Sequence, residues 1–225
     1  MTGEGQPPLQ GGAEAYASAP GGTTNRDRVL DAAARVFATE GLGASVPAIA
    51  SAAGVGVGTI YRAFESKSDL IGALVADRID WVAEQAAVAV RAPESWPALV
   101  DLLWRTAERQ AADRVTAEGL AATYEHPKVL AARERAGVAL TALFERAHAD
   151  GGLRPDFTPA DMQMFFAALA AAQHSTPRGS DAWKRLMGVL VDGLRPEAAT
   201  PFVSEPLRPE EIGQAFEEER ARRSS

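Results

Sequence analysis

Helix start and stop signals recur through the middle of this chain, and no stretch of four to eight residues alternates cleanly between apolar and polar side chains. Serine, threonine and aspartate stand where helix N-caps would be, and glycine or proline follows where helices would end. Alanine, the strongest helix former, makes up about a fifth of the sequence. The sequence therefore predicts an all-α fold.

These start and stop signals predict about nine helices. Capping boxes are expected at Thr24–Asp27, Ser66–Asp69 and Thr158–Asp161, with Pro159 in the first helical turn and Ser180 capping the last helix. The expected helices span about residues 25–40, 46–53, 57–63, 67–90, 95–112, 113–123, 127–150, 159–176 and 181–192.

Composition excludes several classes of protein. The chain has no cysteine, which excludes disulfides and cysteine-bearing metal sites. The longest apolar run, Met164 to Ala172, is far shorter than the roughly 20 residues of a membrane span. No basic residue precedes Arg26 and no apolar stretch lies there, so we expect no signal peptide, no membrane partner and a cytoplasmic location.

Chemistry-bearing side chains do not form a recognisable catalytic or metal-binding pattern. The three histidines, His126, His148 and His174, are not paired at helical ligand spacing. The glycines of residues 54–58 follow an expected helix and lack the third glycine of a dinucleotide loop, because Thr59 stands in its place. We therefore expect no metal, no cofactor and no catalytic residues, and we interpret the chain as a protein other than an enzyme.

Residues 46–70 carry the most informative pattern, because two short helices flank a turn that contains Gly54 and Gly56. Ile60 and Phe64 lie four residues apart and are expected to pack on Val36 and Phe37. A helix packed in this way can place its opposite face in the major groove of DNA. The residues expected on that face are Val57, Gly58, Thr59, Tyr61 and Arg62.

Each polar side chain on this face has a distinct use in DNA binding. Arg62 is the side chain there that can hold guanine through two hydrogen bonds, and the hydroxyls of Thr59 and Tyr61 suit phosphate oxygens. Lys67 opposes the helix dipole at the start of the next helix, which a bound phosphate would compensate. Residues 26–67 carry five basic and four acidic side chains, against a net charge of −7 for the whole chain, so only modest nonspecific affinity is expected.

These residues resemble the TetR family of bacterial transcriptional regulators. The resemblance covers about 45 residues. It is carried by Val29-Leu30, Ala32-Ala33, Val36-Phe37, Gly41, Ile49-Ala50, Ala53-Gly54-Val55, Gly58-Thr59-Ile60-Tyr61, Phe64, Lys67 and Leu70. Position 56, often serine in the family, is Gly56 here, which is an acceptable helix cap.

The resemblance implies a two-fold homodimer that binds a double-stranded DNA operator. It assigns phosphate contacts to Ser45, Thr59, Tyr61 and Lys67, and base contacts to Val57, Gly58 and Arg62. The composition of the two ends and this resemblance together divide the chain into four segments. They are a flexible arm over 1–25, a DNA-binding domain over 26–70, a ligand-binding and dimerisation bundle over 71–195, and a mobile, partly helical tail over 196–225.

Two residue sets in the expected bundle have more than one interpretation. Apolar stripes on the last two helices can form either the core of one chain or a seam between two chains, and the resemblance favours the seam. Its expected residues are Met162, Phe166, Leu169, Trp183, Leu186, Met187 and Leu190. An effector pocket is expected at Trp81, Trp104, Tyr124, Phe144 and Phe165, each of which can also be a core residue.

The sequence thus predicts a transcriptional regulator, most often a repressor in this family, released from DNA by an uncharged or amphipathic small molecule. One alternative keeps DNA binding but replaces the effector with a partner protein or with control by abundance. A second alternative is a helical binding protein or enzyme with a DNA-binding head that has lost its function.

Overall fold

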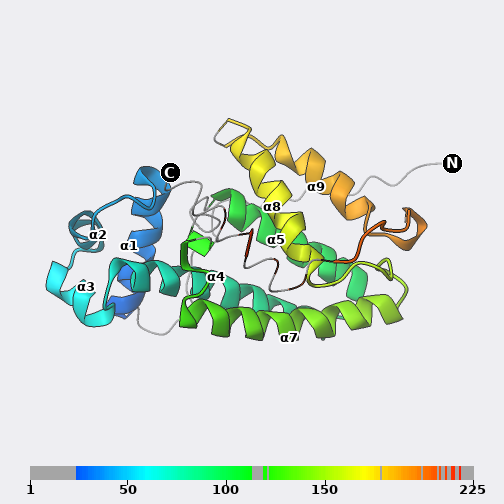
Figure 1. Cartoon of the computed structure of the whole chain (residues 1–225), viewed down its shortest axis with the longest axis horizontal. Coiled ribbons are helices and arrows are strands. Elements are labelled where there is room, and N and C mark those ends of the chain that lie inside the picture. Colours follow the sequence, from blue (N-terminus) through cyan, green and yellow to red (C-terminus); the bar gives the residue numbers. More distant parts are fainter. Residues whose placement is uncertain are drawn as a thin grey trace.

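The structure is a computed structural model of the whole chain (Figure 1). It describes residues 24–112, 119–120, 122–177, 179–198, 200–206, 208, 211, 214, 215 and 218. Within these ranges the regular elements are all helical, which confirms the predicted fold class. The elements with defined bounds are α1 (Asn25–Glu40), α2 (Val46–Ala53), α3 (Val57–Ala63), α4 (Lys67–Ala89), α5 (Ser95–Ala112), α7 (Pro127–Ala149), α8 (Asp161–His174), α9 (Trp183–Asp192) and the 3₁₀ turn Pro196–Ala198.

The first three helices form a compact head at one end of the molecule (Figure 1). The predicted capping box of α1 is confirmed, because Thr24 and Asp27 exchange both of their side chain to backbone hydrogen bonds. Gly41 ends the helix with a φ of 75°, a value that favours glycine. The side chains of Val29, Val36 and Phe37 are buried, as the apolar spacing of this helix predicts.

Helix α4 leaves the head and runs through the body beside α7 (Figure 1). Contacts between the two helices keep a nearly constant offset in sequence, from Asp69–Lys128 through Asp80–Arg135 to a hydrogen bond between Arg146 and the carbonyl of Val90. The two helices therefore run in the same direction. Helices α5, α8 and α9 complete the bundle on the other side of α4.

Two apolar clusters form the core. The first contains the head, the first turns of α4, and Val129 and Ala132 of α7. The second lies among α4, α5, α7, α8 and α9. The domain boundary expected at residue 70 falls inside α4 and inside the first cluster, so the head is packed directly onto the start of the bundle.

Two predicted N-caps, Thr158 and Ser180, differ from the structure, and the capping box at Ser66 is incomplete. Ser66 accepts a hydrogen bond from Asp69 as expected, but the Asp69 carboxylate accepts from Glu65 and not from Ser66. At Thr158 only half of the predicted capping box is present. The Asp161 carboxylate accepts from the N–H of Thr158 at 2.7 Å, but the Thr158 hydroxyl donates to the same carboxylate and α8 begins only at Asp161, with Ala160 as its N-cap. The prediction for Ser180 is wrong, because α9 begins at Trp183 with Ala182 as its N-cap.

Several expectations concern residues that lie outside the described ranges. The expected helix over 113–123 lies largely outside the described residues, although positions 119, 120, 122 and 123 are helical. Residues 1–23 also lie outside them, as do most positions after 206. Among the described helices, none combines the length and apolar character needed to cross a membrane. The described residues likewise contain no group of three or more histidine, aspartate or glutamate side chains arranged to hold a metal ion.

Candidate nucleic-acid interface

Backbone geometry fixes the turn between α2 and α3. The Ser45 hydroxyl accepts from the N–H of Ala48 at 3.3 Å and caps α2 as predicted. Gly54 closes the same helix in the left-handed region, at φ 66° and ψ 36°, where a side chain would be strained. Gly56 is then the N-cap of α3, without a side-chain hydrogen bond. The short turn therefore holds α3 at a defined angle to α2.

Helix α3 has one buried side and one open side. Ile60 and Phe64 are each 1% exposed and join the core of the head, as predicted. On the open side Tyr61 is 53% exposed and Val57 is 37% exposed. A Cβ atom on Gly58 would meet no atom within 4 Å, so packing inside the chain does not require this glycine. The open side of α3 can therefore approach a partner closely, backbone included.

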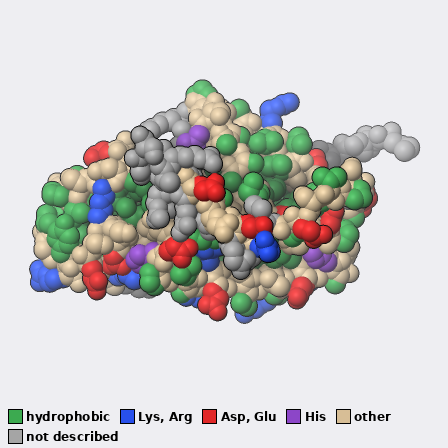
Figure 2. All heavy atoms as spheres, viewed as in Figure 1, with side chains coloured by type: hydrophobic (Ala, Val, Ile, Leu, Met, Phe, Trp, Pro, Cys, Tyr) green, Lys and Arg blue, Asp and Glu red, His purple; other side chains and the backbone are tan. Residues whose placement is uncertain are grey.

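Two cations lie at the ends of this surface. Arg62 is exposed, and its Nε donates to the carbonyl of Gly58 at 3.1 Å, so the guanidinium lies along its own helix. Lys67 begins α4 and its ammonium lies 5.9 Å from the ring centre of Phe37. Hydrophobic side chains with a few charged ones among them cover this end of the molecule (Figure 2).

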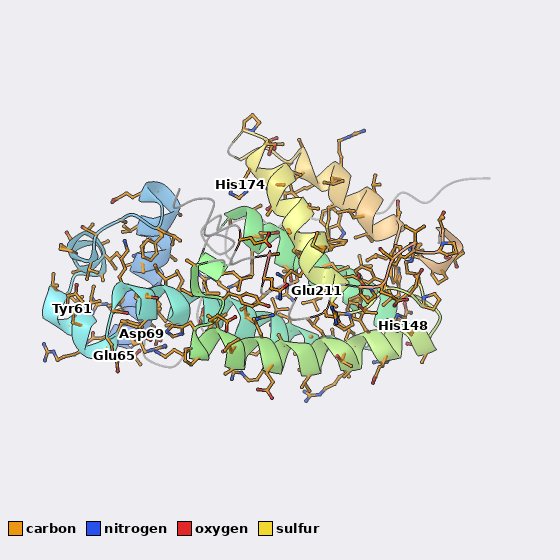
Figure 3. All side chains as sticks on the ribbon, viewed as in Figure 1. Tyr61, Glu65, Asp69, His148, His174 and Glu211 are labelled. Carbon is orange, nitrogen blue, oxygen red and sulfur yellow. The ribbon has the colours of Figure 1, made fainter. Side chains whose placement is uncertain are left out.

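The sequence-predicted contact residues thus share one end of the head. Ser45 and Arg62 are exposed, and Thr59 and Lys67 are partly buried. Tyr61 lies at the tip of the molecule, away from the body (Figure 3). The sequence did not single out Arg28, whose Nη2 donates to the carbonyl of Ala53 at 3.0 Å at the end of α2. No local pattern marks this residue, because the contact spans 25 residues.

The five aromatic residues predicted to line a pocket have separate neighbours among the residues that the structure describes. Trp81 lies against the guanidinium groups of Arg105 and Arg109, at 5.4 and 4.1 Å, and Trp104 lies 6.2 Å from Trp183. Tyr124 accepts a hydrogen bond from Arg133. The rings of Phe144 and Phe165 both pack on Phe157, with centroids 5.7 and 6.4 Å away, and belong to the core of the bundle.

Two surface grooves lie elsewhere, and none of the five aromatic residues lines them. The larger groove, of about 290 Å³, lies between α1, α4 and α7 and is lined by alanines and by charged residues that include Arg26, Asp80 and Arg135. The smaller groove, of about 160 Å³, lies between α4 and α5 and contains Val88 and Leu102.

The residues predicted for a seam between chains divide into two groups. Four of them, Met162, Leu169, Trp183 and Met187, are buried in the core of their own bundle, and so lack the exposed surface that contact with a second chain needs. Phe166 and Leu190 are partly buried, and Leu186 is 37% exposed.

Other apolar side chains are exposed on the same two helices. Met164 on α8 is 56% exposed and Val189 on α9 is 69% exposed. The exposed alanines 167, 168 and 171 continue the face of α8 that begins at Met164. Hydrophobic side chains accordingly gather over α8 and α9 in Figure 2. The alternation of large residues with alanine along α8 was the sequence signal for this face.

Known proteins match both parts of the chain. Residues 29–74 match the family model described as bacterial regulatory proteins, tetR family. Residues 93–196 match the model of the C-terminal domain of SbtR-like transcriptional regulators. Among curated proteins, no sequence matches the chain significantly.

Solved structures of several regulators share the fold. A TetR transcriptional regulator from Streptomyces coelicolor is 33% identical, with a TM-score of 0.59 over 76% of this chain and 98% of that one. A TetR regulatory protein from Mycobacterium vanbaalenii is 28% identical, with a TM-score of 0.52 over 76% and 95% of the two chains. The transcriptional regulator FadR from Bacillus subtilis, in complex with stearoyl-CoA, is 19% identical and shows the fold alone, with a TM-score of 0.56 over 73% and 95% of the two chains.

The family model that matches the head covers the turn and the open helix face described above. The match to the Streptomyces coelicolor regulator covers 98% of that regulator's chain. By these matches the chain belongs to the TetR family of bacterial transcriptional regulators, and its helix-turn-helix head is a DNA-binding domain.

Proposed function

We propose that this regulator is a homodimeric repressor of a pseudo-palindromic operator, released from DNA by a small-molecule effector. The open face of α3 carries the proposal, because it combines an exposed arginine, an exposed tyrosine and a glycine with free space around it. A glycine inside a helix lowers its stability, and packing within the chain does not require Gly58, so a partner that approaches the backbone closely would account for it.

In the proposed complex α3 enters the major groove of DNA. Arg62 leaves the carbonyl of Gly58 and binds guanine, while Val57 and Gly58 face neighbouring bases. The phosphates are held by Ser45, Thr59, Tyr61 and Lys67. Ser45 and Lys67 begin α2 and α4, where the exposed N–H groups of a helix also attract phosphate.

The proposed dimer uses the exposed face of α8 and α9. Met164, Leu186 and Val189 supply its apolar side chains, in place of the four buried residues of the original prediction. A four-helix seam of this kind brings two α3 helices onto the same face of the DNA. The alanines of α8 allow the helices to approach closely.

The effector site is proposed among α4 to α8. Trp81 and Trp104 are its best-supported aromatic residues, because both remain partly exposed, whereas core packing accounts for Phe144 and Phe165. Since the structure with bound stearoyl-CoA shares this fold, a bundle of this kind accommodates an amphipathic ligand. Regulation without an effector is a second candidate, favoured by the rings of Phe144, Phe157 and Phe165, which pack together in the buried core of the bundle, the first two stacked and the last two edge to face.

Fluorescence anisotropy with DNA from upstream of its own gene tests the proposal, with selection from random sequence if that DNA fails. The change Arg62→Ala should weaken operator binding by about 1–3 kcal/mol and relax the preference for guanine. Arg91→Ala removes the same charge from an exposed position at the far end of α4 and should leave binding within about twofold. Equal effects of the two changes would contradict the role of Arg62. If the protein binds specifically neither to the upstream DNA nor to any selected sequence, the proposal of an operator is wrong.

A further inference from the structure

One carboxylate joins the recognition head to the bundle. Asp69 lies in the first turn of α4, and its Oδ1 accepts from the ammonium of Lys128 at 2.7 Å while Nε2 of His126 lies 3.4 Å away. Its Oδ2 accepts from the N–H of Glu65 at 3.2 Å. Partial burial raises the pKa of Asp69, but the hydrogen bonds from Lys128 and Glu65 outweigh burial and hold that pKa below its usual value.

The bond to Glu65 acts on the segment that follows the recognition helix. Phe64 ends α3, with its N–H bonded to the carbonyl of Ile60 and its ring buried in the head. Glu65 comes next, and α4 begins at Lys67 after the cap Ser66. The angle between α3 and α4 therefore depends on this short turn. Figure 3 places Glu65 and Asp69 together at this junction.

The other partners of Asp69 belong to the start of α7. His126 is the N-cap of that helix, because its Nδ1 accepts from the N–H of Lys128 at 3.3 Å. A neutral ring that accepts at Nδ1 carries its proton on Nε2, the atom that faces Asp69. The ring also lies close against α4, since a Cβ atom on Gly72 would be only 2.7 Å from it.

The turn at residues 64–66 connects α3 to α4, so a contact made by this turn can change the angle between the two helices. We propose that the Asp69 carboxylate transmits the position of α7 to this turn, and so couples the effector bundle to the orientation of α3. Asp69 and Lys128 are then positioning residues for DNA binding. The inference rests on the proposed function for its consequence but not for its first test, which needs no DNA.

Hydrogen exchange of the full-length protein without DNA tests the coupling. Lys128→Met removes the charged contact between α7 and Asp69, leaves His126 in place, and should speed amide exchange in peptides covering 57–69 by roughly two- to fivefold. Arg135→Met is the matched control. It removes the same charge and breaks another ion pair between the same helices, with Asp80, which lies far from the turn. Equal exchange in the two variants would overturn the proposal.

Changes at Asp69 separate its two roles. Asp69→Asn keeps an oxygen for the N–H of Glu65 but loses the ionic bond to Lys128, whereas Asp69→Ala loses both. Exchange at 57–69 should therefore rise more in the alanine variant than in the asparagine variant, and adding Lys128→Met to Asp69→Asn should change little. Additive effects of these two changes would contradict a shared path.

Operator binding provides the functional measurement. Lys128→Met should weaken operator affinity by roughly two- to fivefold without changing the slope of affinity against salt. A direct phosphate contact by Lys128 would instead lower that slope by about one, which would overturn the positioning role. If no operator is found but hydrogen exchange still differs between Lys128→Met and Arg135→Met, the proposed function is wrong and the coupling through Asp69 is supported.

Discussion

Arg28 shows how one side chain can determine the geometry of a recognition motif that it does not belong to. Its Nη2 donates to the carbonyl of Ala53, one of the last carbonyls of α2, which have no partner within their own helix. It also lies 3.5 Å from where a Cβ atom of Gly54 would be. The guanidinium of α1 thereby secures the end of α2 and the start of the turn.

We predict that Arg28→Met lowers the free energy of unfolding by about 1 kcal/mol, because one charge-assisted hydrogen bond is lost at a partly buried carbonyl. Operator affinity should fall with an unchanged salt slope, since the loss is one of geometry. Denaturant unfolding and anisotropy measure the two effects. Arg35→Met, an exposed change on the same helix, is the control. A lower salt slope in Arg28→Met alone would show that Arg28 binds phosphate instead.

A buried arginine holds the segment that follows α9. Arg154, 5% exposed, makes hydrogen bonds of 2.6 and 2.9 Å to the carboxylate of Asp156 and donates to the carbonyl of Thr200. Asp156 in turn accepts from the N–H of Phe202 at 3.2 Å. The hydrogen bonds from Arg154, with a smaller contribution from Phe202, lower the pKa of Asp156 to about 2.

The pKa of Asp156 predicts how this attachment depends on pH. A carboxylate with a lowered pKa stabilises the folded state fully above its ordinary value of 3.8 and loses that effect as pH falls toward 2. Carboxyl-carbon NMR should therefore give a midpoint near 2 for Asp156, and Arg154→Met should move it toward 3.8. Asp156→Asn should make the bond after Phe202 more sensitive to chymotrypsin at neutral pH. An unshifted midpoint in the native protein would contradict the ion pair.

At the scale of elements, the proposed seam on α8 and α9 can be tested against a matched exposed valine. Val189 on α9 and Val138 on α7 are 69% and 71% exposed. Val189→Asp should raise the dimer dissociation constant more than tenfold, because two-fold symmetry places two unpaired carboxylates in one interface. Sedimentation velocity measures the shift. Val138→Asp should leave the dimer intact, and an unaffected Val189→Asp dimer would exclude α9 from the seam.

Local signals predicted the ends of the first two helices of the head well. Thr24, Ser45 and Gly54 act only on neighbouring backbone, and the structure confirms all three. The carboxylate of Asp69 was predicted to complete a capping box with Ser66. It accepts hydrogen bonds from Glu65 and Lys128 instead, and Lys128 lies 59 residues away in the sequence. Sequence spacing does not register such distant partners, and so the joint between head and bundle could not be predicted.

The same limit applies to helix faces. The spacing of Ile60 and Phe64 correctly predicted the buried face of α3, because a three-helix head has a single core in which these side chains can pack. On α8 and α9 the spacing identified apolar stripes, but it did not show whether the same chain or a second chain packs on them. Met162, Leu169 and Met187 fill the chain's own core, while the sparser face of Met164 and Val189 stays exposed. The same limit applies to the aromatic residues, since spacing does not show which rings surround a space and which fill it.

At the scale of the molecule, the head and the bundle share a core. Val129 and Ala132 of α7 pack in the same apolar cluster as the head, together with the first turns of α4. A seam between two bundles therefore constrains the heads as well, since each head is packed on the helices that carry it. The proposed dimer thus presents two recognition helices at a separation determined by the protein.

That constraint predicts how the operator must be spaced. Two heads on one face of B-DNA require half-sites about one helical turn, roughly 34–36 Å, or a multiple of it apart. Inserting about five base pairs between the half-sites rotates them to opposite faces, so affinity should fall to that of a single half-site, whereas inserting about ten base pairs should restore part of it where the heads can reach. Anisotropy on the three operators measures this. The monomeric variant Val189→Asp should bind all three equally and weakly, and a native protein that ignores the five-base-pair insertion would show that its heads act independently.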